Sequence, residues 1–228
     1  MSKQKAEEFG NLYTNIKAGT LRKFIRKKIL PFVFTLKIPP VSQINLDIAL
    51  KKQFKRLKPG KVMDVGSWDS PYKKLIPHTE YLTLDVEKDS KPDICCDIHN
   101  IKWKSNYFDT VIATEVLEHL EEPQKAINEI HRILKSRGVC ILSTRFIFPY
   151  HPVPRDYYRY TWDSLKYLFR NFRSVEIHSH GGKLQVLWQM LNYRKTPGIF
   201  LNIFNPLIAR IPSGKTLFPC GFIVYAVK

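Results

Sequence analysis

Val62-Met63-Asp64-Val65-Gly66 decides the fold, together with Asp85, which ends the next hydrophobic stretch of the chain. The apolar residues around Asp64 predict a buried strand over 61–65. A glycine directly after such a strand lets the backbone approach a ligand closely, and an acid at the tip of the second strand can accept hydrogen bonds from both hydroxyls of a ribose. Gly66 alone is a common strand-end turn, but with Asp85 it predicts a nucleoside site.

Strand and helix patterns alternate along the chain beyond this stretch, which is typical of a doubly wound α/β sheet. The predicted strands are 61–65, 81–86, 93–98, 108–114, 139–144, 174–178 and 222–227, and the predicted helices are 41–57, 72–76, 123–135 and 162–169. Pro123 begins the third of these helices and Gly138 ends it. We expect the last strand, 222–227, to close the sheet at its edge.

The composition indicates one well-filled domain with a polyanionic partner. The chain has 228 residues, and 37 Lys and Arg against 20 Asp and Glu give a net charge of +17. Nucleic acid, an anionic lipid surface and a phosphorylated substrate all fit this charge. The apolar run 29–36 is far shorter than the roughly 20 residues that cross a bilayer, so we expect no membrane span.

The four cysteines predict neither a disulfide framework nor a zinc ribbon. Cys95, Cys96, Cys140 and Cys220 lack CxxC spacing and a secretory leader. We expect reduced, intracellular thiols and no metal site. Cys95 and Cys96 fall in a predicted strand, where free cysteine behaves as a small buried hydrophobe.

Basic and apolar attachments flank the predicted domain, which we place at 59–228. Within the N-terminal extension 1–58, residues 21–38 alternate cationic clusters with apolar side chains, which fits an interfacial helix or a solvated basic helix packed on the domain. Residues 182–219 form an apolar insertion before the last strand. This insertion either rests on a membrane, covers the sheet edge or forms a dimer interface.

Residues 61–181 resemble the UbiE-like "methyltransferase type 11" superfamily of class I methyltransferases, which use S-adenosylmethionine. The motifs that carry the resemblance are 64–72, 84–86, 96–98, 107–112, 115–120 and 129–138. The resemblance implies a Rossmann-like, seven-stranded, mostly parallel sheet with helices on both faces. N-terminal helices and the apolar helical insertion are added to it.

The resemblance also implies roles for individual residues. Asp64 and Gly66 shape the methionine side of the cofactor, Asp85 holds the ribose, and Asp97 accepts from the adenine amino group. Glu115 either lines the pocket or caps a turn. The full cofactor-binding set is Asp64, Gly66, Ser67, Trp68, Asp85, Val86, Asp97, Ile98 and Glu115.

Trp68 departs from the family pattern, because related proteins carry a second glycine at this position. An indole here either crowds the methionine half of the cofactor or swings outward on the turn formed by residues 69–71. The first case favours a catalytically silent binding protein that keeps the fold, and the second favours an enzyme.

The loop 151–161 combines a histidine, an acid, two arginines and tyrosines after the fifth strand, at the edge where α/β proteins bind ligands. His151 is the first candidate for a general base, with Asp156 orienting it and His119 as the second candidate. Arg155 and Arg159 are candidates to clamp a phosphate, and the rings of Tyr157 and Tyr158 contact a substrate or pack on the domain. A similar run occurs in family members of cell-surface polysaccharide or glycolipid pathways.

The sequence therefore predicts an S-adenosylmethionine-dependent methyltransferase that methylates an oxygen of a small-molecule, glycan or lipid-linked acceptor. We expect it in the cytoplasm, peripheral at the inner face of a membrane. An RNA methyltransferase is the alternative, motivated by the charge and by the lysine-rich stretch 51–61. Against it, the segment 114–117 lacks the Asn/Asp-Pro-Pro-aromatic run of base amino-methylating enzymes, and no RNA-binding module is recognisable.

Overall fold

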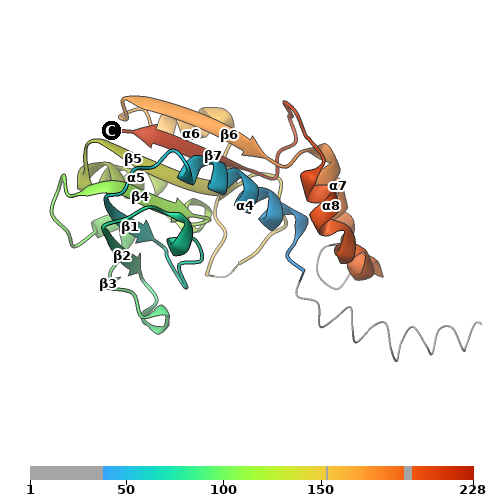
Figure 1. The fold of residues 1–228 in the computed structure, drawn as a ribbon, viewed down its shortest axis with the longest axis horizontal. Coiled ribbons are helices and arrows are strands. Elements are labelled where there is room, and N and C mark those ends of the chain that lie inside the picture. Colours follow the sequence, from blue (N-terminus) through green and yellow to red (C-terminus); the bar gives the residue numbers. More distant parts are fainter. Residues whose placement is uncertain (1–37, 153, 193–196) are drawn as a thin grey trace, which may run out of the picture.

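A seven-stranded sheet in the order β3-β2-β1-β4-β5-β7-β6 forms the middle layer of the computed structural model, which describes residues 38–152, 154–192 and 197–228 (Figure 1). The strands are β1 Lys61–Val65, β2 Glu80–Asp85, β3 Ile94–Cys95, β4 Phe108–Thr114, β5 Leu134–Arg145, β6 Ser174–His180 and β7 Gly221–Val227. Neighbouring strands from β3 to β5 run parallel, and β7 runs antiparallel to both β5 and β6. This confirms the predicted Rossmann-like, mostly parallel sheet.

The position of the last strand differs from the prediction. Residues 222–227 were expected at the sheet edge, but β7 lies between β5 and β6, so β6 is the edge strand. The burial of the two strands explains the order. Six of the seven residues of β7 are buried, whereas β6 alternates between exposed and partly buried residues up to His180. A strand that is apolar on both faces needs neighbours on both sides.

Helices and 3-10 turns follow the strands. They are α4 Val41–Phe54, η2 Lys73–Leu75, η3 Lys88–Ser90, η4 Ile98–Asn100, η5 Leu117–His119, α5 Pro123–Ile133, α6 Trp162–Leu168, α7 Lys183–Asn192, η6 Pro197–Phe204 and α8 Asn205–Arg210. The prediction that α5 reaches Lys135 and ends at Gly138 is wrong. Leu134 already pairs with Phe108, so β5 begins there and Gly138 lies within it.

The sheet separates two apolar clusters, because successive side chains of a strand point to opposite faces. In β4, Val111 and Ala113 pack in the cluster of α5 and α6, and Ile112 packs in the cluster of α4. Leu46 and Leu50 of α4 are fully buried, and burying each such side chain contributes about 1.5–3 kcal/mol. The helix α4 is therefore an integral layer of the domain (Figure 1).

The four cysteines are free thiols. Cys140 and Cys220 are buried, but Cys95 is exposed and Cys96 is only partly buried. The prediction of a buried pair is wrong because β3 has only two residues and forms the edge of the sheet. At an edge, the side chains lack a second strand to cover them.

The structure describes most of the predicted insertion 182–219 but almost none of the predicted segment 21–38. The predicted segment 21–38 lies, except for its last residue, outside the described residues. The insertion 182–219 forms α7, η6 and α8, and α7 and α8 pack against α4 at one end of the sheet (Figure 1). Among the described residues, no helix is long and apolar enough to cross a membrane.

A substitution at Gly66 tests how closely the turn after β1 approaches the segment after β4. Its φ is +63°, and a Cβ atom there would lie 2.4 Å from Cγ2 of Val116. Gly214 has φ +56° and nothing within 4 Å of such an atom, so it is a matched control. Gly214→Ala should lower the free energy of unfolding by about 1–2 kcal/mol, the cost of left-handed backbone. Gly66→Ala should cost about 1–3 kcal/mol more, because of overpacking.

Urea unfolding gives the free energy of unfolding of both variants. Adding Val116→Ala to Gly66→Ala should recover part of the loss, because it removes the methyl group that the new Cβ meets. Equal destabilisation by Gly66→Ala and Gly214→Ala would contradict the close approach of these two segments.

Candidate active site

Asp85 is held by the turn that follows β1. Its carboxylate accepts the backbone N–H of Trp68 on Oδ2 at 2.9 Å and that of Glu87 on Oδ1 at 3.0 Å. The side chain is buried. Each carboxylate oxygen keeps a further lone pair, so the oriented carboxylate can accept two more hydrogen bonds from a ligand.

The turn from Gly66 to Ser70 is wound in an unusual backbone conformation. Trp68 and Ser70 have positive φ values of 44° and 49°, as Gly66 does. The indole of Trp68 is nevertheless 63% exposed, so it swings outward and does not fill the space beside the turn. Ser67 Oγ is buried and has no hydrogen-bond partner among the described residues. This unpaired hydroxyl and the glycine cradle fit a polar ligand.

Asp64 lies in β1, directly before the turn. Tyr81 of β2 donates its hydroxyl hydrogen to Asp64 Oδ2 at 2.7 Å. Burial raises the pKa of Asp64 to about 6, against the lowering effect of the Tyr81 hydrogen bond. The carboxylate is therefore ionised at neutral pH and is held in place, ready to face a cationic group.

The remaining predicted cofactor residues follow β2 and β3 at the same edge. Val86 is exposed and Ile98 is buried. Asp97 is exposed and caps η4, accepting the backbone N–H of His99 at 2.8 Å, while His99 Nδ1 lies 2.6 Å from the same oxygen. One carboxylate oxygen of Asp97, Oδ1, is thus already bonded to His99, and Oδ2 is left for a ligand.

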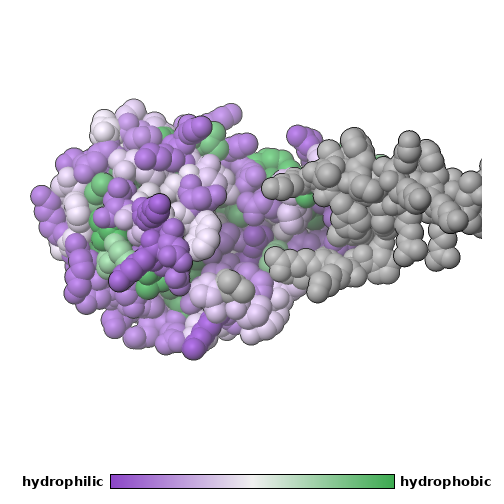
Figure 2. All heavy atoms as spheres, turned by 90° about the horizontal axis from the view of Figure 1, so that it is seen from below, coloured by the Kyte–Doolittle hydropathy of each residue, from purple (hydrophilic) through white to green (hydrophobic). Residues whose placement is uncertain are grey.

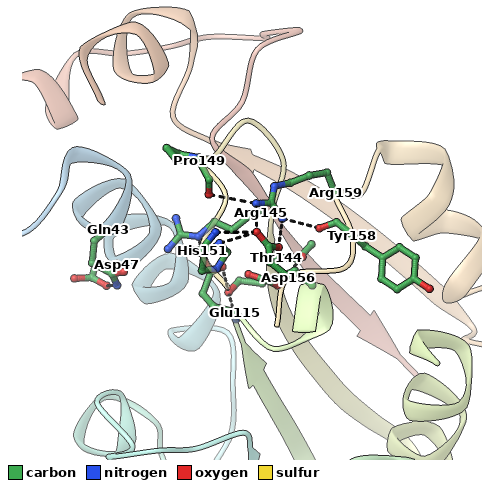
Figure 3. A network of polar contacts seen from close by, with 12 residues as sticks. Gln43, Asp47, Glu115, Thr144, Arg145, Pro149, His151, Asp156, Tyr158 and Arg159 are labelled. Carbon is green, nitrogen blue, oxygen red and sulfur yellow. Dashed lines mark hydrogen bonds and ion pairs between the residues drawn. The ribbon is translucent and has the colours of Figure 1, made fainter. Parts of the chain in front are cut away.

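Glu115 and Arg145 form a buried ion pair at the ends of β4 and β5 (Figure 3). Ser143 donates its hydroxyl hydrogen to Glu115 Oε1 at 2.8 Å, and Glu115 has a positive φ of 58°. The guanidinium carbon of Arg145 lies 4.2 Å from the ring centre of Phe148. The Glu115 carboxylate does not cap the η5 turn, because it is bound by Ser143 and Arg145, and its role in lining the cofactor pocket stays a prediction.

Glu118 is a site residue that the sequence analysis missed. It is 0% exposed, and Thr144 donates to its Oε2 at 2.9 Å. Burial, together with the nearby Glu115, raises the pKa of Glu118 to about 8. Arg145 was missed as well. Two sequence signals could have pointed to these residues. Glu115 and Glu118 are acids three residues apart after the fourth strand, and Arg145 directly follows the predicted strand 139–144.

The loop after β5 is organised around Asp156, whose side chain is buried (Figure 3). It pairs with both terminal nitrogens of Arg159 and accepts the backbone N–H of His151 at 3.0 Å. Burial alone would raise the pKa of Asp156, but Arg159 and the His151 N–H outweigh it and lower this pKa to about 2. Burial, partly opposed by Asp156, lowers the pKa of His151. The imidazole of His151 is therefore neutral at pH 7.

The outer part of the loop is attached to the η5 turn. The backbone N–H groups of Tyr157 and Tyr158 donate to the Glu118 carbonyl at 2.9 and 3.4 Å, and the Tyr158 hydroxyl donates to the Glu121 carbonyl at 3.1 Å. Tyr157 pairs with the Glu121 carboxylate. The predicted loop residues and His119 therefore come together at one edge, with Arg159 committed to Asp156.

A second polar group that sequence reasoning missed lies on α4, across from Glu115 and Arg145 in Figure 3. Tyr72 donates to Asp47 Oδ1 at 2.7 Å, and Gln43 donates to the same oxygen at 2.9 Å. No motif pointed to Gln43 and Asp47, because α4 precedes the motif-bearing part of the chain.

The sheet order reverses between β1 and β4, and ligands of α/β proteins bind at this switch point, where Gly66 and Glu115 meet. The fold is the one shared by class I, S-adenosylmethionine-dependent methyltransferases. Residues 77–142 match the family model described as "Methyltransferase domain", of type 11. This match and the fold together support an S-adenosylmethionine-dependent methyltransferase, as the motifs predicted, with S-adenosylmethionine as its cofactor.

Known proteins agree with this assignment. An uncharacterised protein of Methanocaldococcus jannaschii is 34% identical over 100 residues, which span 41% of this chain and 44% of that protein. A methyltransferase structure from Archaeoglobus fulgidus has a TM-score of 0.55 at 15% identity, covering 86% of this chain and 99% of its own. Phosphoethanolamine N-methyltransferase 2 of Haemonchus contortus, solved with phosphomonomethylethanolamine and S-adenosylhomocysteine, has a TM-score of 0.51 at 15% identity, covering 80% and 52%. At such identities, the structural likeness shows the fold.

Asp85→Ala should weaken the binding of S-adenosylmethionine about 100-fold or more, because two charge-assisted hydrogen bonds contribute about 1.5–3 kcal/mol each. Asp163→Asn, at an exposed position of α6, is the control and should leave affinity unchanged. Isothermal titration calorimetry measures both. Unchanged affinity in Asp85→Ala would show that the ribose does not bind at this carboxylate.

Proposed function

We propose that the chain transfers the methyl group of S-adenosylmethionine to a hydroxyl oxygen of a lipid-linked or glycan-lipid acceptor at an anionic membrane surface. The fold and the family support the methyl donor. The observation that carries the acceptor class is the insertion between β6 and β7, whose helix α7 exposes Leu184, Leu187 and Met190 and buries Gln185 and Gln189.

The exposure pattern of helix α7 is the reverse of that of an ordinary surface helix, which buries its apolar face. Leu184, Leu187 and Met190 are 45%, 50% and 51% exposed, whereas Gln185 and Gln189 are buried. Gln185 Nε2 donates to the carbonyls of Ile208 and Ile211, at 3.1 and 2.9 Å, so the polar face holds the insertion together. A large exposed apolar surface indicates an interaction site, and an apolar medium such as a bilayer matches it.

The apolar surface extends beyond α7. Its further members, all exposed, are Leu201, Ile203, Phe204, Leu207, Ile211, Leu217 and Phe218. In Figure 2, hydrophobic residues are visible at the end of the described part where α7 and α8 lie in Figure 1. Exposed Lys183, Arg210 and Lys215 border this surface. With the net charge of +17, this favours an anionic surface.

The insertion begins and ends beside the candidate active site. It leaves the sheet after His180 and returns at Cys220, and Cys220 N–H donates to the His180 carbonyl at 3.0 Å. The next pair along β7, Gly221 with Arg145, lies at the site itself. A lipid acceptor lying against the insertion would therefore have its head group at the edge that carries the loop 151–161.

Methyl transfer to a hydroxyl forms an oxygen–carbon bond as the carbon–sulfur bond of the sulfonium breaks, and the hydroxyl proton leaves. When bound, S-adenosylmethionine supplies the electrophilic methyl group. Asp85 and the Gly66 turn would hold its nucleoside, and Asp64 its cationic amino acid end. The neutral imidazole of His151, whose ring lies 4.9 Å from that of His119, would accept the hydroxyl proton, with His119 as the second candidate. Arg155, Tyr157 and Tyr158 would contact the acceptor from outside.

The double variant Leu184→Gln/Leu187→Gln should weaken binding to phosphatidylcholine–phosphatidylglycerol vesicles about tenfold or more, because it removes two half-exposed leucines from the apolar surface. Leu75→Gln, an exposed leucine on η2, is the matched control and should bind as the native chain does. Vesicle sedimentation at several lipid concentrations gives the partition coefficients. Equal binding by both variants would contradict membrane contact through α7.

Methyl-labelled S-adenosylmethionine tests the activity directly on lipid, glycan and RNA fractions. We expect label in the lipid fraction, and at least a tenfold lower rate for the Leu184→Gln/Leu187→Gln variant on vesicle-borne acceptor. Label in RNA alone would establish the alternative activity. Tight cofactor binding without transfer to any fraction would identify a silent binding protein instead.

A further inference from the structure

Glu118, His119 and His151 gather three potential metal ligands at the acceptor side of the site. One ligand atom from each lies within 4.8 Å of the other two. Glu118 and His119 belong to the η5 turn after β4, and His151 belongs to the loop after β5, so residues distant in sequence converge here. Two imidazoles and one carboxylate form a ligand set that divalent metals of the first transition row accept.

One carboxylate oxygen of Glu118 has no hydrogen-bond partner among the described residues, and a bound cation would take that place. The side chain is fully buried, and Thr144 satisfies only Oε2. Glu118 Oε1 has no hydrogen-bond partner among the described residues. The two nearby guanidinium groups are engaged elsewhere, Arg145 with Glu115 and Arg159 with Asp156. A buried carboxylate oxygen without a partner is costly, and a bound cation removes this cost.

Both histidines have the second contact that orients a metal ligand. His119 Nδ1 faces the Arg155 carbonyl oxygen, and His151 Nδ1 lies 3.1 Å from Asp156 Oδ2. Metal-binding histidines usually direct one ring nitrogen to a carbonyl or carboxylate and bind the ion with the other. In this arrangement Nε2 of each ring is the ligand atom.

We propose that Glu118, His119 and His151 bind a divalent transition-metal ion whose open positions take hydroxyl oxygen of the acceptor. Ligands around one such ion lie about 3–4 Å apart, so the cluster would contract by about 1 Å. A bound ion would lower the pKa of the acceptor hydroxyl and orient it, so that its proton would pass to solvent water, with His119 and His151 acting as metal ligands in place of a base. This catalytic role depends on the proposed methyl transfer, but the metal site itself does not.

The test is a titration of the metal-free full-length protein with Co²⁺, followed by displacement with Zn²⁺. We expect one equivalent of Co²⁺ and visible absorption bands from nitrogen and oxygen ligands. His151→Ala and Glu118→Gln should each weaken binding at least 100-fold, and Asp156→Asn about 10–100-fold, because Asp156 orients His151. His178→Ala, a half-exposed histidine on β6, is the control and should bind as the native chain does.

Affinity for S-adenosylmethionine, measured by calorimetry, shows that each variant remains folded. If Glu118→Gln fails to fold, His119→Gln and His151→Asn test the same site. The absence of Co²⁺ binding at millimolar concentrations, or equal affinity in His151→Ala and His178→Ala, would overturn the proposal. Methyl transfer that persists in the presence of EDTA would overturn the catalytic role alone. Stoichiometric metal binding without methyl transfer would overturn the proposed function and leave the metal site standing.

Discussion

The contact between the turn at Gly66 and Val116 is the constraint on which the rest of the site depends. It lies at the switch point between β1 and β4, where the two halves of the sheet diverge. Gly66 has a φ of +63°, and a Cβ atom there would lie 2.4 Å from Cγ2 of Val116, so the left-handed turn and the close approach both require glycine. That turn directs the Trp68 N–H to Asp85 and leaves the indole outside. One steric contact thus shapes the cofactor side and removes the crowding expected from Trp68.

The acceptor side depends on charge instead of steric contact. Glu115, Glu118 and Asp156 lie buried or half-buried within one small region, and Arg145 and Arg159 neutralise two of the three. The Arg159–Asp156 pair organises the loop 151–161 internally, and the backbone hydrogen bonds from Tyr157 and Tyr158 to the Glu118 carbonyl attach the loop to the η5 turn. The resulting rigidity presents His119 and His151 in defined positions. Within the described residues Glu118 has no such arginine partner, which agrees with its raised pKa, and a bound cation would therefore complement this edge.

Local patterns predicted the strands well and the tertiary pairings poorly. Residues 61–65 and 108–114 form strands with the predicted bounds, because their apolar residues are bounded by clear turn signals. The order of β6 and β7 could not be read locally, since hydrophobicity does not show which neighbours a strand will have. The same limit applies to the site. Gly66 and Asp85 belong to a motif, whereas the partners of Glu118 and Asp47 come from segments more than twenty residues away.

The sequence showed that 182–219 is apolar, but it did not show which face of each helix in this segment would be buried. In α7 the choice follows from hydrogen bonding: Gln185 satisfies two carbonyls at the end of α8, and Trp188 donates to Asn205 Oδ1 at 2.9 Å. Turning the helix to bury its leucines would leave those carbonyls unpaired, and a buried unpaired carbonyl costs about 1–3 kcal/mol. The apolar face therefore stays outward without a partner strand or helix from the described chain to cover it. Since the insertion begins and ends beside Arg145, its outward apolar face and the acceptor edge belong to one continuous side of the molecule.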